Sequence, residues 1–308
     1  MGDVIHNLPI VADIRTRYPH ADIHWLVEES FAEIPALHPG LNRVIPVALR
    51  RWRRHFSHRA TWHELRQLHR CLSETAYDFI LDTQGLIKSA LLGRLAKGKH
   101  IGPDRHSTRE SLAAWFYDTR FRLNWADHAV VRYRTLAAHA FDLAPNLPLN
   151  YGVRAPDSNL PWLPQTPYAV LLHATSRAEK LWPEAEWVKL GRALASRGIA
   201  IVLPWGNPTE KLRAQTLAQN IPSALLTPRL SLRDAATLLH RAALVVGVDT
   251  GLLHLASALG TPAIGIYCAS EASENGLYAS SPIRNFGSTG HPPNATTVIT
   301  AATELTRV

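Results

Sequence analysis

Residues 244–254 read Leu-Val-Val-Gly-Val-Asp-Thr-Gly-Leu-Leu-His, and this stretch decides the fold. The run from Ala242 to Val248 is almost purely apolar and short, which predicts a parallel strand buried on both faces. The polarity changes at Asp249, and the residues from Leu252 onward have helical apolar spacing with no breaker before Gly260. The stretch therefore predicts a strand, a tight turn and a helix, the unit that builds parallel α/β sheets.

The turn in this stretch has the residue types of an anion-binding site. Ligands of open α/β sheets bind beyond the carboxyl ends of the strands, where unpaired amides at a helix N-terminus attract a phosphate. Gly251 allows close approach to the backbone, Thr250 offers a hydroxyl donor, and His254 lies one turn further on the same face. The alternative is that Asp249 and Thr250 only cap the helix.

Length and composition restrict the class of protein. A chain of 308 residues suits two domains, and no apolar stretch approaches the ~20 residues of a membrane span. The net charge of +8 predicts an anionic partner such as nucleic acid, an anionic membrane or a phosphorylated substrate. Cys71 and Cys268 form no redox or metal motif, which favours a reducing cytosol, and the 16 His residues form no metal-binding pattern.

The chain opens with Met1-Gly-Asp-Val-Ile-His-Asn-Leu-Pro9, which predicts a turn running into a helix. An α/β domain normally delivers such a turn from the end of a buried strand. We therefore expect a chain that begins late, at an internal Met, with the central strand of the first sheet missing and its neighbours left with unpaired edges. The alternative is a domain built without its first strand.

Strands and helices alternate along the rest of the chain, and a Pro- and Asn-rich linker at 144–167 separates domain 1–150 from domain 151–308. The pattern predicts two α/β domains with parallel, doubly wound sheets that face each other across a cleft. The expected strands are 23–27, 43–47, 77–82 (buried), 100–102, 168–172, 199–203, 223–226, 242–248 and 262–267, and the expected helical segments are 31–37, 61–74, 128–141, 184–197, 208–219, 231–241, 251–259 and 296–308.

Further polar residues follow other strands of the second domain, at the same edge as Asp249. Thr175 and Ser176 offer donors, Lys180 offers a cation for a diphosphate, and Glu210 could hold ribose hydroxyls. These residues together suggest a nucleotide pocket. Taken singly, these residues have other interpretations. Lys180 could be a solvated surface charge, and Glu210 could be an acid favoured by its helix dipole. Trp182, which follows Lys180 closely, could belong to the core.

The first domain offers a base and a cationic cluster. Asp3, at the opening turn, could take a proton from an attacking hydroxyl, although an N-cap is the alternative. The dense run at 50–54 suits carboxylates or phosphates, and Trp52 within it could pack on a sugar or a membrane. The alternative for this run is a solvated loop. Its four arginines are Arg50, Arg51, Arg53 and Arg54.

These motifs together resemble the ADP-heptose:lipopolysaccharide heptosyltransferases, glycosyltransferase family 9, over essentially the whole chain. The motifs that carry the resemblance are Met1-Gly-Asp-Val-Ile-His with Pro9, Asp82-Thr-Gln-Gly-Leu-Ile-Lys-Ser, His173-Ala-Thr-Ser, Lys180-Leu-Trp-Pro-Glu, Leu203-Pro-Trp-Gly and Val248-Asp-Thr-Gly-Leu-Leu-His. The arginine run is similar to that of the branch that places the first heptose on Kdo of the inner core.

The resemblance implies a GT-B fold of two Rossmann-like domains and an inverting transfer without a required metal or cofactor. It implies Asp3 as the catalytic base and the four arginines as acceptor-binding residues. The implied ADP-heptose site comprises Thr175, Ser176, Lys180, Glu210, Asp249, Thr250, Gly251 and His254.

The resemblance also implies the donor ADP-L-glycero-β-D-manno-heptose and the acceptor Kdo2-lipid A. We expect a cytoplasmic monomer at the anionic inner face of the inner membrane, with its terminal helix packed on the first domain. Two alternatives remain open: the same chemistry on a heptose acceptor, and an inactive nucleotide-sugar-binding truncation. A nucleic-acid binder fits the charge, but the sequence has no known reading motif, so no nucleic acid is expected.

Overall fold

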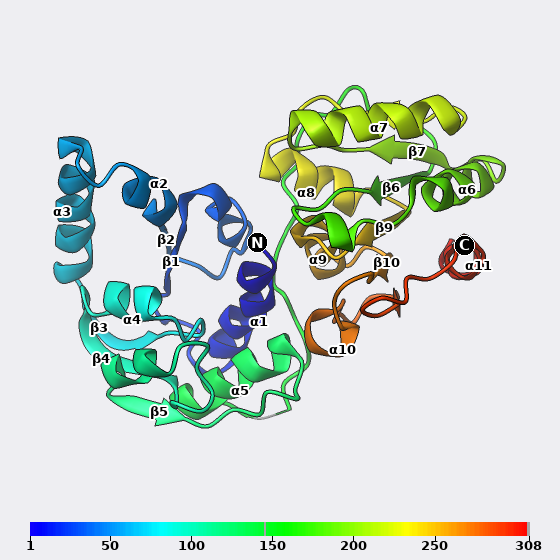
Figure 1. Cartoon of the computed structure of the whole chain (residues 1–308). Coiled ribbons are helices and arrows are strands. Elements are labelled where there is room, and N and C mark those ends of the chain that lie inside the picture. The colour runs from blue at the N-terminus through cyan, green and yellow to red at the C-terminus, as the bar shows by residue number, and fades with distance from the viewer. Residues whose placement is uncertain (145, 307–308) are drawn as a thin grey trace. The chain divides into compact units, whose positions relative to one another are not determined.

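The computed structural model describes residues 1–144 and 146–306 (Figure 1). The chain divides into two compact units, His6–Gly152 on the one hand and Met1–Ile5 with Val153–Val308 on the other. Within the described residues, no helix combines the length and the apolarity needed to cross a membrane.

The unit that contains Val153–Val308 is built on a six-stranded parallel sheet of order β11-β10-β9-β6-β7-β8. From β8 across to β11 this is the doubly wound order 3-2-1-4-5-6, and the strand order reverses between β6 and β9. The strands are β6 (Tyr168–Leu172), β7 (Ala200–Leu203), β8 (Leu225–Leu226), β9 (Leu244–Val248), β10 (Ala263–Ile266) and β11 (Ile283–Phe286).

Strands β6 and β9 are buried at every residue, which explains their continuous apolar sequences. Trp182 and Trp187 are fully buried and pack edge to face with ring centroids 5.0 Å apart, so the core interpretation of Trp182 is confirmed. The helical elements are η4 (Ala178–Lys180), α6 (Glu184–Ala195), α7 (Pro208–Asn220), α8 (Leu232–His240), α9 (Gly251–Ala258), α10 (Ala272–Asn275) and α11 (Ala295–Leu305). The terminal helix expected at 296–308 is confirmed as far as Leu305, and residues 307–308 lie outside the described residues. Its apolar residues pack against α6 and β10 in the core of its own unit, whereas packing on the first domain was expected.

The unit His6–Gly152 contains two separate parallel sheets, β1-β2 and β3-β4-β5. The strands are β1 (His24–Glu28), β2 (Arg43–Val47), β3 (Ala76–Leu81), β4 (Lys97–Pro103) and β5 (Thr119–Phe121). The helical elements are α1 (Gly2–Arg17), whose residues Gly2–Ile5 belong to the other unit, η1 (Glu29–Phe31), η2 (Pro35–Leu37), α2 (Leu49–Arg54), α3 (Arg59–Ser73), α4 (Ile87–Gly93), η3 (Ser111–Phe116) and α5 (Ala129–Phe141). The helical segment expected at 31–37 is therefore a pair of 3₁₀ turns, and the short strands β5 and β11 were not expected.

The division into two sheets leaves backbone edges unpaired, as expected. Among residues 1–144 and 146–306, no strand pairs with the second edge of β1 or of β3. The amino-terminal ends of these strands meet through side chains, with 2.8 Å between His24 Nδ1 and the Tyr77 hydroxyl. The prediction of a buried strand at 77–82 is wrong in its burial, because β3 is an edge strand and Phe79 is 47% exposed.

Candidate functional site

The structure brings two polar turns together where the order of the large sheet reverses. Strands β6 and β9 are hydrogen-bonded neighbours, with Leu172 opposite Gly247, so the chain segments that follow them leave the sheet side by side. The Thr175 hydroxyl on the first segment donates to the Asp249 carbonyl oxygen on the second at 3.4 Å. In doubly wound sheets this reversal is the place where ligands bind.

The Asp249 carboxylate is the centre of this site. It accepts hydrogen bonds from Lys180 Nζ at 2.5 Å and from the Ser270 hydroxyl at 2.9 Å, and His254 Nε2 lies 3.6 Å from its other oxygen. Burial alone raises the pKa of Asp249, but the interactions with His254 and Lys180 outweigh burial and hold this pKa well below its usual range. Lys180 is 18% exposed, so its surface-charge interpretation is wrong.

At the start of helix α9, the polar side chain at the N-cap position does not cap the helix. Thr250 occupies the N-cap position, but no side chain there makes a capping hydrogen bond, so the interpretation of Asp249 and Thr250 as mere caps is not supported. A Cβ at Gly251 would lie 2.5 Å from the side chain of Met1, which belongs to the same unit. Because Gly251 has no side chain, another group can approach the backbone amides at the start of α9 closely, as the Met1 side chain does in the structure.

Arg213, on helix α7, fixes the segment that carries Lys180. Its guanidinium donates to the carbonyl oxygens of His173 (3.2 Å) and Trp182 (2.7 Å) and to the Glu184 carboxylate (2.7 Å). These three partners lie on both sides of η4, so one side chain holds both ends of the segment. No motif in the sequence indicates this role, since Arg213 follows helical spacing alone.

Two other residues predicted to bind the donor, Ser176 and Glu210, lie outside the cluster around Asp249. Ser176 is exposed on the segment before η4. The Glu210 carboxylate accepts from the Gly206 amide (2.7 Å) and from the Asn207 side chain (2.8 Å), while Asn207 caps the Glu210 amide (3.0 Å). Glu210 thus makes a reciprocal cap at the start of α7, and it is only half-buried, which leaves it open to other partners.

His173 follows strand β6 and is fully buried, and its burial, reinforced by the charge of Arg213, lowers its pKa to about 4. An unfolded histidine titrates near 6.5, so the folded chain binds fewer protons between these values, and stability falls as the pH drops from about 6.5 towards 4. In His173→Gln we expect the free energy of unfolding to fall less over this pH range than in the parent chain, by up to about 3 kcal/mol. Measuring the free energy of unfolding at several pH values would show this difference. Buried His38, whose pKa is likewise lowered to about 4, maintains part of the slope. A slope identical to that of the parent chain would contradict the assignment.

The predicted residues of the first domain lie in α1 and α2. Asp3 is half-buried in the first turn of α1. Arg51 is held by the carboxylates of Glu29 (3.0 Å) and Glu64 (2.9 Å), which raise its pKa. The expectation that Trp52 packs on a sugar or a membrane is wrong, because it is 6% exposed in the core and donates to Glu64. The other three arginines of the run, Arg50, Arg53 and Arg54, are exposed.

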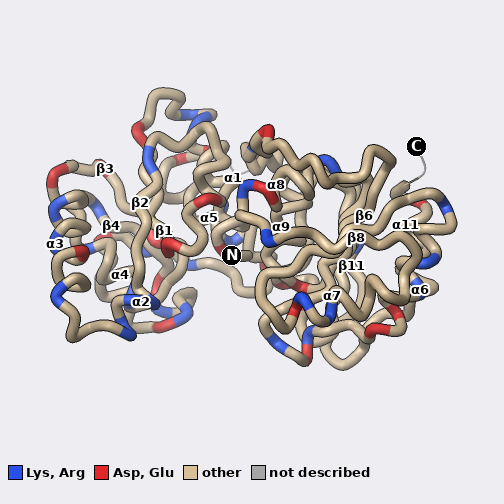
Figure 2. The backbone as a smooth tube through the Cα atoms, turned by 90° about the horizontal axis from the view of Figure 1, so that it is seen from above, with Lys and Arg blue, Asp and Glu red and all other residues tan. Residues whose placement is uncertain are grey.

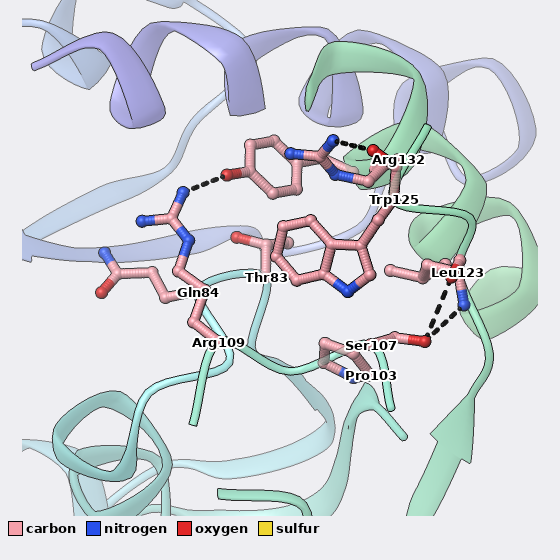
Figure 3. Close-up of a pocket in the computed structure, with 9 residues that line it drawn as sticks. Thr83, Gln84, Pro103, Ser107, Arg109, Leu123, Trp125 and Arg132 are labelled. Atoms are coloured by element: carbon pink, nitrogen blue, oxygen red, sulfur yellow. Dashed lines mark hydrogen bonds between the residues drawn. The ribbon is translucent and has the colours of Figure 1, made fainter. Parts of the chain in front are cut away.

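A small pocket at the ends of β3 and β4 was missed by the sequence analysis (Figure 3). Its walls include Gln84, Arg109 and Trp125, and Arg109 donates to the Tyr133 hydroxyl at 3.1 Å. Arg132 stacks 4.6 Å over the Trp125 ring while donating to backbone oxygens. The Asp82-Thr-Gln-Gly motif was the available signal, since it ends strand β3 at this pocket. Its acid, Asp82, orders the turn by accepting from the Gln84 amide and the Ser89 hydroxyl.

Comparisons with known proteins agree on one family. The family model "Glycosyltransferase family 9 (heptosyltransferase)" matches residues 65–300. Proteins named lipopolysaccharide heptosyltransferase 1 are similar: one from Pseudomonas aeruginosa is 42% identical over 92% of this chain and 80% of its own, and one from Escherichia coli K12 is 42% identical over 87% and 84%.

Solved structures show the same likeness. The E. coli heptosyltransferase WaaC with ADP superposes with a TM-score of 0.90 at 38% identity, covering 99% of this chain and 97% of that one. The same enzyme with ADP-2-deoxy-2-fluoro heptose gives a TM-score of 0.87 at 37% identity, with coverage of 99% and 96%. This likeness confirms the expected GT-B fold with two Rossmann-like units.

Proposed function

Because the chain belongs to glycosyltransferase family 9 (heptosyltransferase), we propose that it is a heptosyltransferase I of lipopolysaccharide core biosynthesis. Its reaction would transfer L-glycero-D-manno-heptose from ADP-heptose to a Kdo hydroxyl of Kdo2-lipid A. The observation that carries the proposal is the Lys180–Asp249–His254 cluster where the parallel sheet reverses. A relative 37% identical over nearly the whole chain has been solved with an ADP-heptose analogue, which supports this donor.

The donor diphosphate would bind between the segment of Lys180 and the start of α9. Lys180, the Thr250 hydroxyl and the amides at Gly251 would stabilise the negative charge that develops on the departing ADP. Asp249 would orient Lys180, since the two are already in contact. Thr175 and Ser176 would add donors, and Glu210 would bind the ribose hydroxyls in exchange for its cap bonds.

Asp3 would take the proton of the Kdo hydroxyl as that oxygen attacks the anomeric carbon from the face opposite the diphosphate. The bond to the phosphate oxygen breaks as the new glycosidic bond forms, so the configuration inverts. This chemistry requires only a base and a stabilised leaving group, and we propose that it proceeds without a metal or another cofactor.

The acceptor would be held by arginine. Arg50, Arg53 and Arg54 are exposed, and Arg109 lies on the pocket at the end of β3, so guanidinium groups are available for the carboxylates of Kdo and the phosphates of lipid A. We propose that the enzyme works as a cytoplasmic monomer at the inner face of the inner membrane, where a lipid-linked acceptor resides.

An acceptor panel tests the function. Purified chain would be incubated with ADP-heptose and with either Kdo2-lipid A or an acceptor that already carries the first heptose, and product would be followed by mass spectrometry. Transfer to the Kdo acceptor alone supports the proposal. Transfer to the heptose acceptor alone would assign a heptosyltransferase II or III, and ADP-heptose binding without transfer to either would indicate a binding protein.

Arg213→Ala is expected to weaken ADP binding about tenfold, because the loss of three hydrogen bonds frees the segment that positions Lys180. Arg213→Lys should recover little, since an ammonium cannot reach three divergent acceptors. Arg192→Ala is the matched control, because Arg192 also donates to a backbone oxygen, of Asn220, but on the far side of α6 from η4. Calorimetric titration with ADP would show the difference, and equal affinities in both alanine variants would overturn the positioning role.

A further inference from the structure

The corner between α2 and α3 carries a basic surface that the proposed reaction uses only in part, at Arg50, Arg53 and Arg54. Residues 50–70 contain seven arginines, four histidines and one acid, Glu64. Glu64 is occupied by Arg51 and Trp52. In the part of the chain that the structure describes, no acidic side chain pairs with five exposed arginines of this segment, which are Arg53, Arg54, Arg59, Arg66 and Arg70.

Helix α3 has one buried face and one exposed face. Thr61, Leu68 and Leu72 are buried against the unit. Its exposed basic and aromatic residues fall on the opposite face at helical spacing, and they are Arg59, Trp62, His63, Arg66, His69 and Arg70. Figure 2 shows Lys and Arg recurring along α2 and α3. The outward face of α3 is therefore a cationic stripe about three turns long, and the opposite face packs against the unit.

Two large aromatic side chains stand at the amino-terminal end of this stripe. Phe56 is 59% exposed and Trp62 is 43% exposed, and their rings pack edge to face with centroids 4.8 Å apart. The Trp62 indole N–H donates to the Phe56 carbonyl oxygen at 3.0 Å, and the Thr61 hydroxyl fixes the same turn by donating to the His55 carbonyl oxygen at 2.8 Å. The pair is thus a rigid apolar projection with its polar group already satisfied.

From this juxtaposition we infer that the α2–α3 corner docks on an anionic lipid bilayer, with Phe56 and Trp62 inserted among the headgroups and the arginines of α3 on the lipid phosphates. Internal bonding of the indole N–H means that Trp62 loses no hydrogen bond on leaving water. Each basic residue near an anionic surface strengthens binding about fivefold. Nucleic acid suits this surface less well, because the edge-to-face packing holds the two rings against each other and covers a face of one of them, which restricts stacking on bases.

Vesicle co-sedimentation of the full chain tests the inference. Wild-type protein should bind vesicles of phosphatidylglycerol and phosphatidylethanolamine at about 0.15 M salt and leave pure phosphatidylcholine vesicles unbound. Phe56→Ser with Trp62→Ser should weaken binding about tenfold, and Arg66→Ser with Arg70→Ser about thirtyfold. Two control variants keep the composition matched: Trp115→Ser removes a 75% exposed tryptophan elsewhere, and Arg154→Ser with Arg197→Ser removes two exposed arginines.

This inference rests on the proposed function only for the choice of a membrane as the partner. The experiment distinguishes the failure of one from the failure of the other. Binding is measured without donor or acceptor, so it can succeed where transfer fails. Equal losses in the corner and control variants, or equal binding to neutral vesicles, would overturn the docking surface. Tighter binding to duplex DNA than to the anionic vesicles at the same salt, lost in the corner variants, would assign the surface to nucleic acid instead. All four substituted side chains at the corner are exposed, and circular dichroism would verify that the variants fold.

Discussion

Asp3→Asn is expected to abolish heptose transfer while leaving ADP-heptose binding almost unchanged. Asparagine retains the shape of the side chain but cannot accept the proton of the Kdo hydroxyl, and a positioned base contributes roughly 10²–10⁴-fold to such a rate. The measurement is a pair: the rate of product formation with saturating substrates, and the affinity for ADP by calorimetry. Unaltered turnover would remove Asp3 from the mechanism.

Asp13 provides the control for this experiment, because it is another acid on helix α1. Its carboxylate is 6% exposed and accepts two hydrogen bonds from Arg134, at 2.7 and 2.9 Å. Asp13→Asn should therefore lower the free energy of unfolding, since it weakens a buried ion pair. Asp3→Asn should lower it less, because Asp3 is only half-buried. A variant that loses transfer at unaltered stability identifies a chemical role, whereas parallel losses in both variants would indicate damage to α1.

Asp249→Asn is expected to destabilise the fold by about 3 kcal/mol, because it leaves the Lys180 ammonium mostly buried without its counter-charge. The pKa of Asp249 is depressed in the fold, so the carboxylate stabilises the protein at neutral pH. This contribution decreases below about pH 4, where the unfolded carboxyl begins to protonate. Chemical unfolding at neutral pH would measure the loss.

Ser270→Ala is the matched control, since it removes one hydrogen bond to the same carboxylate without changing any charge. We expect it to cost about 1 kcal/mol. Combining Asp249→Asn with Lys180→Met should recover much of the lost stability, because no charge then remains uncompensated. Equal costs for Asp249→Asn and Ser270→Ala would show that the ion pair contributes little.

The sequence predicted the unit built on the six-stranded sheet closely, because its strands are continuous apolar runs buried on both faces, as in β6 and β9. Strand β11 was missed because its exposed residues Arg284 and Asn285 hide the pattern. In the other unit the apolar sequence of β3 predicted burial, but burial depends on neighbouring strands, which a local pattern does not contain. The exposure of Phe79 is the result.

The sequence predicted which residues belong to the candidate site, but it did not predict the contacts between them. Lys180 and Asp249 are 69 positions apart, and their contact depends on the adjacency of β6 and β9. Arg213 belongs to no motif, so only the folded chain reveals its three acceptors. Trp52 was misjudged because a tryptophan among arginines resembles a surface anchor, whereas the chain turns it inward onto Glu64 and leaves the anchoring positions to Phe56 and Trp62.

The two separate sheets of the unit His6–Gly152 have a consequence for the behaviour of the protein at high concentration. Unpaired amides and carbonyls along β1 and β3 can accept an extended segment from any other chain, and such pairing depends on backbone and not on side-chain chemistry. Self-association by this route would be little affected by salt or by the large positive charge of the molecule. We therefore expect self-association at high concentration to respond more to changes at these sheet edges than to changes in surface charge.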